Sequence, residues 1–354
     1  MSEGVRDAVV LATPADLSSR VAGVPLLLRT ILVLQRSGIE RVHVPGSVEV
    51  PADPRIRVAI THETSPAGAH LVVGSGAVVD QTLVRAASIA CDGVCWEYEG
   101  ARIERRPGAP SPRTTAPPAG TLLPVSTPRG IVEHALLRGL ENPHDGYLDG
   151  AINRRLSRPL TRLLLRTPLT PNHVTVIGVL LGIAGGVLLG AATTAGVLAG
   201  VAALLVSGVL DCCDGEIARI KFTESRIGHL LDITGDTLVH AALLAGIATQ
   251  LARTGAWPGT ATLALLAIGV AGSFAAITWS EQSEARRRLV AGAWENRIID
   301  GVLSPLTTRD WYVFPVAFAL AGRLDALLPA AAWGAQVFWV AVVMLVRRVL
   351  RRRE

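Results

Sequence analysis

Hydrophobic and polar positions divide this chain of 354 residues near residue 170. Beyond that point, apolar residues run together in stretches that approach the length of about 20 residues a helix needs to cross a bilayer. We assign membrane-spanning helices to six stretches, which are 172–191, 195–217, 227–250, 257–280, 311–325 and 327–346. The pattern therefore predicts an all-α bundle of six transmembrane helices in the second half of the chain.

Shorter patterns precede the bundle and alternate between strand and helix. Strand-like runs lie at 8–12, 41–44, 57–60 and 70–73, and helical apolar spacing lies at 25–37. Alternation of this kind predicts a small cytoplasmic α/β domain with a parallel sheet, which we place at 1–106. Proline, alanine, serine and threonine dominate 107–128, a composition typical of a linker. The membrane domain then occupies 129–354.

An amphipathic segment lies just before the first span. In Leu148–Leu165, arginines lie on one side of the expected helix, and leucines lie on the other, at Leu156, Leu160, Leu163 and Leu164. Such a pattern predicts a juxtamembrane helix that lies along the membrane surface. Two prolines end it, and Asn172 stands at the start of the first span. At that position Asn172 would either cap the helix, or lie among the exposed backbone amides of the helix start that face a diphosphate.

Composition and charge support a membrane protein. Charged residues make up 18% of the chain and the mean hydropathy is +0.41. The net charge of +5 comes from arginine, because Lys221 is the only lysine. Basic residues cluster before the first span, between the second and third, between the fourth and fifth, and after the sixth. The positive-inside rule then places both termini in the cytoplasm, and we assign the chain to the inner membrane. The basic residues are better explained by anionic lipid headgroups or phosphate substrates than by nucleic acid.

Four aspartates interrupt this apolar half, in the run Asp211-x2-Asp214-Gly215-x2-Ala218-Arg219-x8-Gly228-x3-Asp232-x3-Asp236. Each Asp at the centre of a membrane helix costs about 3 kcal/mol, so four cost on the order of 10 kcal/mol. Such residues are usually functional. Divalent cations would compensate the charge, because clustered carboxylates suit Mg²⁺, Ca²⁺ or Mn²⁺.

Helical spacing brings these side chains together. Asp211 and Asp214 share a face of the second span with Gly215 and Ala218, and Asp232 and Asp236 share a face of the third with Gly228. Two antiparallel helices joined by a short cytoplasmic loop can place all four carboxylates at one point. The small residues would let a ligand or a neighbouring backbone approach closely.

Two other interpretations of the aspartates remain. They could neutralise arginines or line a proton path in a structural bundle, or they could bind a cation in a transporter or channel. The first leaves the alternation of small residues and carboxylates unexplained and offers only Arg219 as a placed partner. The second needs polar residues that continue across the bilayer, and the first, fourth and sixth spans have almost none.

The aspartate run resembles the signature of the CDP-alcohol phosphatidyltransferase family at every motif position. The resemblance implies an integral membrane enzyme, usually dimeric, that transfers a substituted phosphoryl group from a CDP-alcohol to a hydroxyl acceptor and releases CMP. It implies two divalent ions, Mg²⁺ or Mn²⁺, held by Asp211, Asp214 and Asp232, with Asp236 near the second ion and acting as general base. It also implies a CDP pocket shaped by Gly215, Ala218, Arg219 and Gly228.

Flanking strings narrow the resemblance. Residues 142–146, 152–154, 157–159, 170–175 and 309–311 look like the subgroup that includes bifunctional inositol-phosphate cytidylyltransferase and di-inositol-phosphate-phosphate synthase. An acceptor of that type carries a phosphate, and Arg286–Arg288 either bind it or only set the topology. The other acceptor class is a lipid alcohol.

The N-terminal domain resembles a nucleotidyltransferase that has lost its chemistry. Thr13–Arg20 stands where that family has a glycine-rich, basic loop, so backbone amides cannot cradle a triphosphate in the usual way. In the later strand, Gly74 is followed by Ser75 where the family has a metal-binding aspartate. We expect an inactive domain and a CDP-alcohol made elsewhere, and the alternative is a bifunctional enzyme that makes its own.

Overall fold

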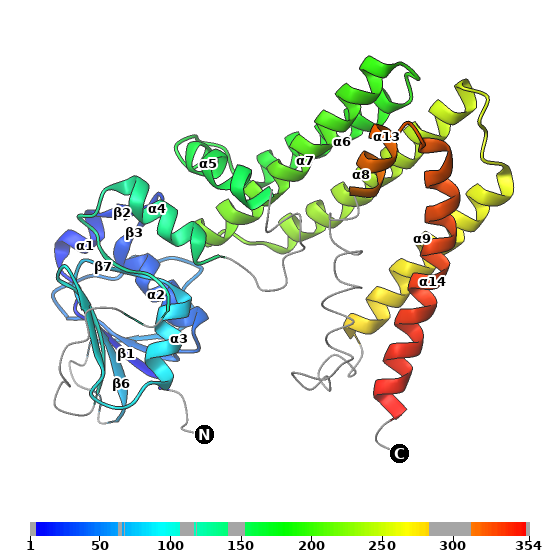
Figure 1. Ribbon diagram of the computed structural model, residues 1–354. Helices are drawn as coiled ribbons and strands as arrows, with labels where there is room; N and C mark the ends of the chain where they lie inside the picture. Colours follow the sequence, from blue (N-terminus) through cyan, green and yellow to red (C-terminus); the bar gives the residue numbers. More distant parts are fainter. Residues whose placement is uncertain are drawn as a thin grey trace. The chain divides into compact units, whose positions relative to one another are not determined.

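The computed structural model describes residues 5–62, 66, 68–106, 117, 119–140, 153–282 and 313–351 (Figure 1). Its contacts divide the chain into two compact units. The first comprises Met1–Glu141, Arg158–Leu169 and Gly215–Glu224, and the second comprises Asn142–Ser157, Thr170–Asp214 and Ser225–Glu354.

A six-stranded sheet forms the centre of the first unit, in the order β5-β4-β1-β6-β9-β8. The strands are β1 (Asp7–Val10), β4 (Arg41–His43), β5 (Ala59–Thr61), β6 (His70–Val73), β8 (Cys95–Tyr98) and β9 (Ala101–Arg106). The first four pair in parallel, as the alternating pattern predicts, whereas β9 is antiparallel to both β6 and β8. The sheet is therefore mixed, not wholly parallel.

A tight turn accounts for the antiparallel edge. Glu99 and Gly100 join β8 to β9 with φ angles of 48° and 86°. Positive φ at both central residues is the conformation of a two-residue hairpin loop, whose twist matches that of the strands. Glu-Gly is a weaker signal for this turn than Asn-Gly or Asp-Gly, which is why the sequence pattern did not reveal the hairpin.

Helices α2 (Leu26–Arg36) and α3 (Gln81–Ile89) pack with this sheet around one apolar core. Nine of the eleven residues of α2 are buried, among them Ile31 and Leu34. The Asp80 side chain caps α3 by accepting a hydrogen bond from the Leu83 amide at 2.8 Å. The unit also contains the shorter elements α1 (Pro14–Ser18), β2 (Arg20–Val21), β3 (Val24–Pro25) and β7 (Ala77–Val79).

Part of the expected linker belongs to the first unit. Strand β10 (Leu122–Pro124) lies inside 107–128 and pairs antiparallel with β7. Helix α4 (Arg129–Arg138) follows and buries Leu136 and Leu137. The first unit thus extends beyond residue 106, into the region that composition alone assigned to the linker and the membrane domain.

Long apolar helices form most of the second unit. Among the described residues, five helices are long and apolar enough to cross a membrane: α6 (Pro171–Leu189), α7 (Thr194–Lys221), α8 (Arg226–Arg253), α9 (Thr260–Gln282) and α14 (Leu324–Arg351). They correspond to five of the six predicted spans. Of the sixth, 311–325, the described part is the eight-residue helix α13 (Val313–Leu320), so the count of six is not confirmed.

Glycines allow close packing between α6 and α8. A Cβ on Gly246 would lie 2.0 Å from the carbonyl oxygen of Gly186, and one on Gly235 would lie 2.4 Å from a methyl group of Val179. Both approaches are closer than side-chain atoms tolerate, so the two backbones meet directly at Gly186 and Gly246, and the Val179 side chain packs against the bare backbone at Gly235. The Gly235 end of this contact adjoins the candidate site, because Gly235 lies between Asp232 and Asp236 on α8.

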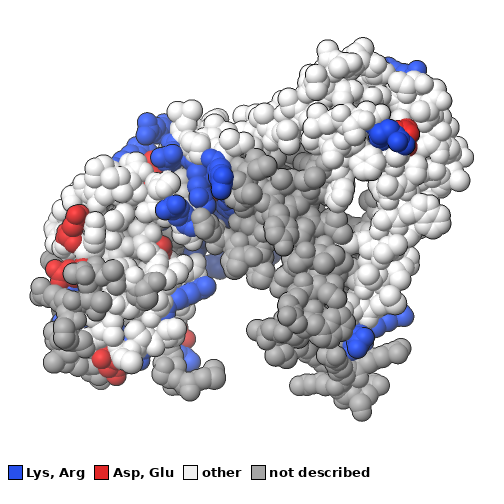
Figure 2. Space-filling model, in the orientation of Figure 1, with Lys and Arg blue, Asp and Glu red and all other residues white. Residues whose placement is uncertain are grey.

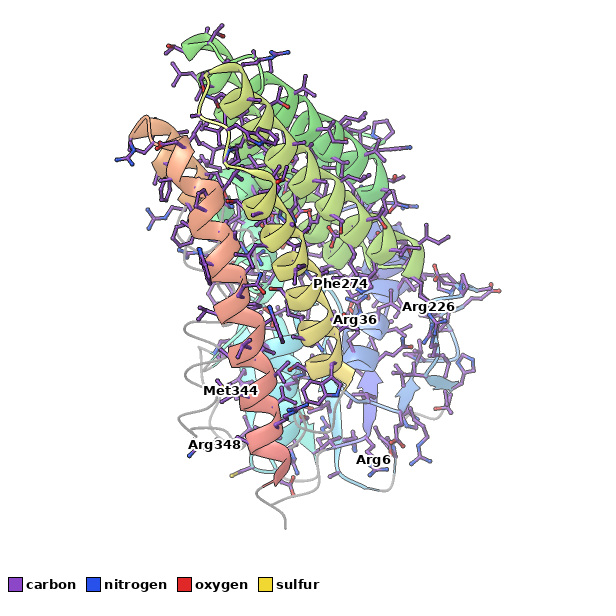
Figure 3. All side chains as sticks on the ribbon, turned by 90° about the vertical axis from the view of Figure 1, so that its right-hand side faces the viewer. Arg6, Arg36, Arg226, Phe274, Met344 and Arg348 are labelled. Carbon is purple, nitrogen blue, oxygen red and sulfur yellow. The ribbon has the colours of Figure 1, made fainter. Side chains whose placement is uncertain are left out.

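Helices α9 and α14 pack side by side along their length (Figure 1). Phe274 on α9 and Met344 on α14, both labelled in Figure 3, are 64% and 62% exposed. Charged side chains are sparse on the described surface of these helices and gather toward their ends (Figure 2). An uncharged, apolar surface of this kind is what a lipid-facing helix requires.

The expected amphipathic segment contains helix α5 (Arg154–Leu164), whereas 148–152 lies outside the described residues. Leu156 and Leu163 are 54% and 59% exposed, so their apolar side chains are left uncovered. The helix is present, and its position along a membrane surface stays a prediction.

Candidate metal and phosphate-transfer site

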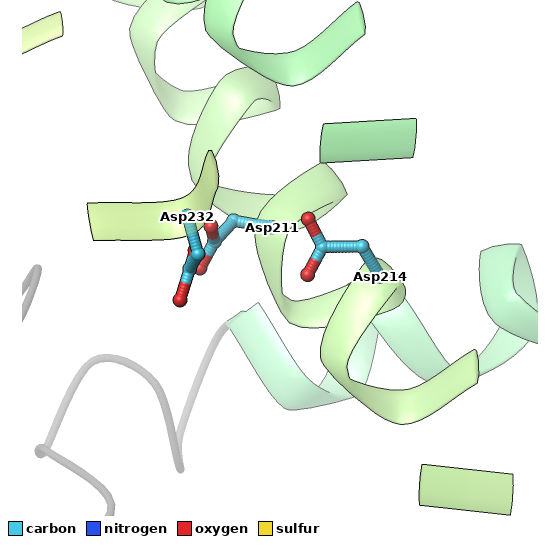
Figure 4. A group of neighbouring side chains, drawn as sticks. All are labelled: Asp211, Asp214 and Asp232. Carbon is cyan, nitrogen blue, oxygen red and sulfur yellow. The ribbon is translucent and has the colours of Figure 1, made fainter. Parts of the chain in front are cut away.

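Helices α7 and α8 bring three of the four predicted carboxylates together (Figure 4). Asp211 and Asp214 are one turn apart on α7, and Asp232 comes from α8. One carboxylate oxygen from each lies within 4.8 Å of the others. Three like charges at this separation repel one another, so the arrangement favours a cation among them.

Asp214 is the most deeply placed of the three. It is buried, whereas Asp211 and Asp232 are partly exposed. The Thr175 hydroxyl on α6 donates a hydrogen bond to Asp214 Oδ2 at 2.5 Å. A short charge-assisted bond fixes the orientation of the carboxylate and satisfies one of its lone pairs. The two exposed aspartates leave the group open to a ligand.

Asp236 lies one helical turn beyond Asp232 on α8 and is half-buried. It does not belong to the group of three that lies within 4.8 Å. Neither do His229 and His240 on the same helix. The geometry therefore separates one aspartate from the other three, which spacing alone could not do.

Two of the residues expected around the donor lie close together in the second unit. A Cβ on Gly228 would be 3.2 Å from Asn172 Oδ1 and 3.2 Å from Ser225 Oγ. The α8 backbone thus meets the first turn of α6, and Gly228 leaves the Asn172 amide uncrowded. Ser225 caps α8 by accepting a hydrogen bond from the Gly228 amide at 3.0 Å.

The other expected residues lie on α7, within the first unit. The Arg219 guanidinium reaches back over Gly215, where a Cβ would be 3.2 Å from Nη2. Ala218 is half-buried one residue before Arg219. A larger residue at position 215 would displace this guanidinium. Arg286–Arg288, a candidate phosphate site, lie outside the described residues.

Sequence reasoning missed two buried residues that form hydrogen bonds at or beside the aspartate group. Thr175 is one, because a threonine near the start of a membrane helix usually bonds its own backbone. The Thr175 hydroxyl does lie 3.1 Å from the Pro171 carbonyl oxygen, in addition to its shorter contact with Asp214. Glu216 is the other: it is fully buried and accepts a hydrogen bond from the Thr161 hydroxyl on α5 at 2.6 Å. A buried carboxylate two residues after Asp214 is a signal that the sequence did contain.

In the N-terminal domain, an internal carboxylate fills the loop region after β1. Asp16 is buried and accepts hydrogen bonds from the Thr13 amide at 2.7 Å, the Ser75 hydroxyl at 2.9 Å and the Gly76 amide at 3.0 Å. Backbone amides at the carboxyl ends of parallel strands are common donors to phosphate. Here Asp16 already occupies two of them, and its own charge would repel a phosphate.

The membrane part of the chain matches a known family model. Residues 168–346 match the model described as CDP-alcohol phosphatidyltransferase, which covers half of the chain and includes all four aspartates. The chain belongs to the CDP-alcohol phosphatidyltransferase family. This confirms the family resemblance predicted from the aspartate run.

Curated relatives of this CDP-alcohol phosphatidyltransferase family protein include proteins of two kinds. A bifunctional IPC transferase and DIPP synthase of Thermococcus kodakarensis is 35% identical over 147 residues, 40% of this chain and 32% of that protein. The same-named protein of Rubrobacter xylanophilus is 34% identical over 143 residues, or 39% and 32%. A phosphatidylinositol phosphate synthase of Mycobacterium marinum is 33% identical over 101 residues, or 28% and 42%. The chain thus spans about a third of the length of the first relatives it matches.

Proposed function

We propose that this protein is an integral membrane transferase that moves a substituted phosphoryl group from a CDP-alcohol to a hydroxyl acceptor. The acceptor oxygen forms a bond to the phosphorus that carries the alcohol. The bond between that phosphorus and the bridging oxygen of the diphosphate breaks, and CMP leaves with both bonding electrons. Membership of the family supports the reaction class, and the geometry of the aspartates supports the site.

The observation that carries the proposal is the group formed by Asp211, Asp214 and Asp232, whose oxygens lie within 4.8 Å of one another. Hard oxygen ligands in this number suit Mg²⁺ or Mn²⁺, and these three residues would hold the ion, with Asp236 near a second one. A bound divalent ion supplies neutralisation of the diphosphate and stabilisation of the leaving phosphate.

The protein's own residues would then orient the donor and move the proton. Asp236, which stands apart from the group of three, accepts the proton of the acceptor hydroxyl as general base. Arg219 offers a fixed positive charge to the donor's phosphates. Gly215, Ala218 and Gly228 leave room for the nucleotide, as the family resemblance implies. Asn172, at the start of α6, lies beside exposed helix amides that could face the diphosphate.

The relatives' names direct the choice of acceptors. Phosphatidylinositol phosphate synthase is one of the names, and bifunctional IPC transferase and DIPP synthase is the other. Together with the resemblance of the flanking strings, they favour an inositol phosphate as the acceptor to test first, with a lipid alcohol as the second class.

The N-terminal domain is proposed to make no CDP-alcohol. Asp16 supports this, because its carboxylate occupies the Thr13 and Gly76 amides that a nucleotide phosphate would otherwise use. Incubation with CTP, Mg²⁺ and inositol 1-phosphate should therefore release no pyrophosphate. Measurable pyrophosphate would favour the bifunctional enzyme instead.

We place the protein in the inner membrane, as a homodimer with both termini in the cytoplasm. The positions of arginine support this orientation through the positive-inside rule, and the family resemblance supports the dimer. Thiol labelling of single cysteines introduced at residue 3 and residue 354, with a membrane-impermeant reagent, should require opened vesicles. Light scattering of the detergent-purified protein gives its mass.

The main assay measures CMP release by purified protein in detergent with Mg²⁺ or Mn²⁺. A panel of CDP-diacylglycerol and CDP-inositol is crossed with inositol phosphate and lipid alcohols as acceptors. CMP is expected from at least one pair, with a stoichiometric condensed product, and Asp214→Asn should abolish it. Undiminished turnover in Asp214→Asn would refute the site assignment, and a transporter would show no CMP with any pair.

A further inference from the structure

The C-terminal end of α7 has all four of its last carbonyl groups satisfied, and half of the donors come from the N-terminal domain. The last four carbonyls of a helix have no partner within the helix. The Thr223 amide donates to Ala218 O at 2.9 Å, and the Phe222 amide donates to Arg219 O at 3.4 Å. These two bonds form a Schellman motif, in which Phe222 holds the position after the helix.

Side chains of the N-terminal domain satisfy the other two carbonyls. Arg29 on α2 donates through Nη1 to Ile220 O at 3.0 Å. Arg55, from the segment before β5, donates through Nη1 to Lys221 O at 2.8 Å. Asp53 holds the Arg55 guanidinium by accepting from Nε and Nη2, each at 2.8 Å. Two cations thus face the negative end of the helix dipole, which favours them.

Phe222 adds an aromatic anchor to this cap. Its φ is 56°, a left-handed conformation that glycine usually supplies at this position. Its side chain is nevertheless buried in the apolar core of the N-terminal domain. The Arg29 guanidinium lies 5.2 Å and the Arg36 guanidinium 4.5 Å from the centre of the ring. A capping role alone would be met best by glycine, so the ring has a separate use.

Acidic residues lie near both arginines that contact the Phe222 ring, Arg29 and Arg36. Arg36 makes a two-pronged ion pair with Glu224, two residues after Phe222. Burial lowers the pKa of Arg29 to about 10, with Asp80 opposing and Arg36 adding to the decrease. Arg29 therefore keeps its charge at neutral pH. The segment from Ile220 to Glu224 is fixed at its backbone, at its ring and at its carboxylate.

We infer that this cap, formed by Arg29, Arg36, Arg55 and Phe222, positions the end of α7 for the aspartate group. The inference rests on the proposed function. Asp214 precedes Ile220 by six residues, about 9 Å along the helix. Four residues, 222–225, connect α7 to α8, so the same cap restrains the approach to Asp232. The N-terminal domain then serves the transferase as a positioning element and not as a second enzyme.

Phe222→Gly tests this role, because it removes the ring while keeping a residue suited to the left-handed cap. We expect the Mn²⁺ dissociation constant, read from the electron paramagnetic resonance signal of free Mn²⁺, to rise about tenfold. We expect kcat to fall about tenfold with KM for the acceptor within about twofold. Amide exchange of 215–224 should quicken. Unchanged Mn²⁺ affinity and kcat in Phe222→Gly would show that Phe222 only caps the helix.

Two further variants guard against a general folding defect. Phe222→Leu keeps an apolar anchor and should recover part of the Mn²⁺ affinity that Phe222→Gly loses. Arg29→Lys keeps the positive charge but loses the fixed contact with Ile220 O, so its Mn²⁺ affinity should fall below that of the wild type. Arg6→Ala removes an exposed ion pair with Glu40 in the same domain and should match the wild type in every measurement. If Arg6→Ala weakened Mn²⁺ binding as much as Phe222→Gly, domain stability would explain the effect and positioning would not.

The measurements also separate the inference from the function on which it rests. Absence of CMP release by the wild-type protein would overturn the proposed transferase. The Mn²⁺ comparison between wild type and Phe222→Gly would still decide the positioning role, because it needs no turnover.

Discussion

The Thr175 hydroxyl on α6 donates a 2.5 Å hydrogen bond to Asp214 Oδ2 on α7. Both residues are buried, so the bond replaces water that neither group can reach. It links α6 to the aspartate group that α7 and α8 share, and it holds the deepest of the three carboxylates in one orientation.

Thr175→Val should therefore weaken the site without removing a ligand. Valine has the shape of threonine but no hydroxyl, which leaves Asp214 short of one donor. Partners that orient a metal ligand are worth about 10- to 100-fold in affinity or activity. We expect a decrease of about tenfold in Mn²⁺ affinity and in the rate of CMP release. Thr175→Ser is the matched control and should stay close to the wild type, and equal behaviour of the two variants would argue against this bond.

Asp236 and Asp232 should respond differently to the same change. Because Asp236 lies outside the group of three, Asp236→Asn should leave Mn²⁺ affinity within about threefold while lowering kcat by about 10²- to 10⁴-fold, the range for loss of a general base. Asp232→Asn removes a proposed metal ligand and should lower both the Mn²⁺ affinity and kcat. Titration by calorimetry, beside the CMP assay, measures the two quantities. A loss of affinity in Asp236→Asn as large as in Asp232→Asn would place Asp236 among the principal ligands.

The aspartate group shows how far sequence reasoning reaches. Spacing by helical turns correctly put Asp211 and Asp214 beside Asp232, because two adjacent helices with a short connection have few ways to pack. It could not separate Asp236, since residues at i and i+4 share a face and differ only in depth. The distances between the carboxylate oxygens made that distinction.

Contacts remote in sequence were beyond prediction. Arg29 and Ile220 are 191 positions apart, and no local pattern indicates that a guanidinium from an α/β domain caps a membrane helix. The β8–β9 hairpin was missed for a local reason, its uncommon Glu99-Gly100 turn. By contrast, five of the six assigned spans correspond to candidate spanning helices, because long apolar runs leave the backbone little alternative in a membrane.

Gly246 should be intolerant of any side chain. A Cβ there would lie 2.0 Å from Gly186 O, and both backbones would have to move apart. Overpacking of this kind costs about 1 to 3 kcal/mol. Gly246→Ala should therefore lower the midpoint of thermal unfolding in detergent. Gly334→Ala is the control, because a Cβ at Gly334 on α14 meets no atom within 4 Å and alanine favours a helix. A midpoint for Gly246→Ala at or above that of Gly334→Ala would contradict the close α6–α8 contact.

His134 on α4 should respond to salt. Although His134 is exposed, desolvation by partial burial lowers its pKa below the ordinary value of 6.5, and the positive charges of Arg138, Arg162 and Arg158 lower it further. The Debye length is roughly 10 Å at 0.1 M salt and 3 Å at 1 M, so added salt weakens the arginine contribution but not that of burial. We expect the pKa of His134, measured by NMR on protein with ¹³C-labelled histidine, to rise between 0.05 and 1 M NaCl yet stay below its ordinary value. A pKa that falls or stays constant would contradict the arginine contribution.

The lowered pKa of His134 also determines how the free energy of unfolding changes with pH. Because the folded protein holds His134 at a lowered pKa, the unfolded chain binds more protons as the pH falls below about 6.5. The free energy of unfolding should therefore be highest above that pH and decrease from there down through the lowered pKa. His134→Gln should flatten this part of the profile, and Arg138→Gln should shrink it by raising the pKa of His134. Denaturation followed between pH 5 and pH 8 tests both, and a profile for His134→Gln as steep as the wild type's would assign the dependence to another group.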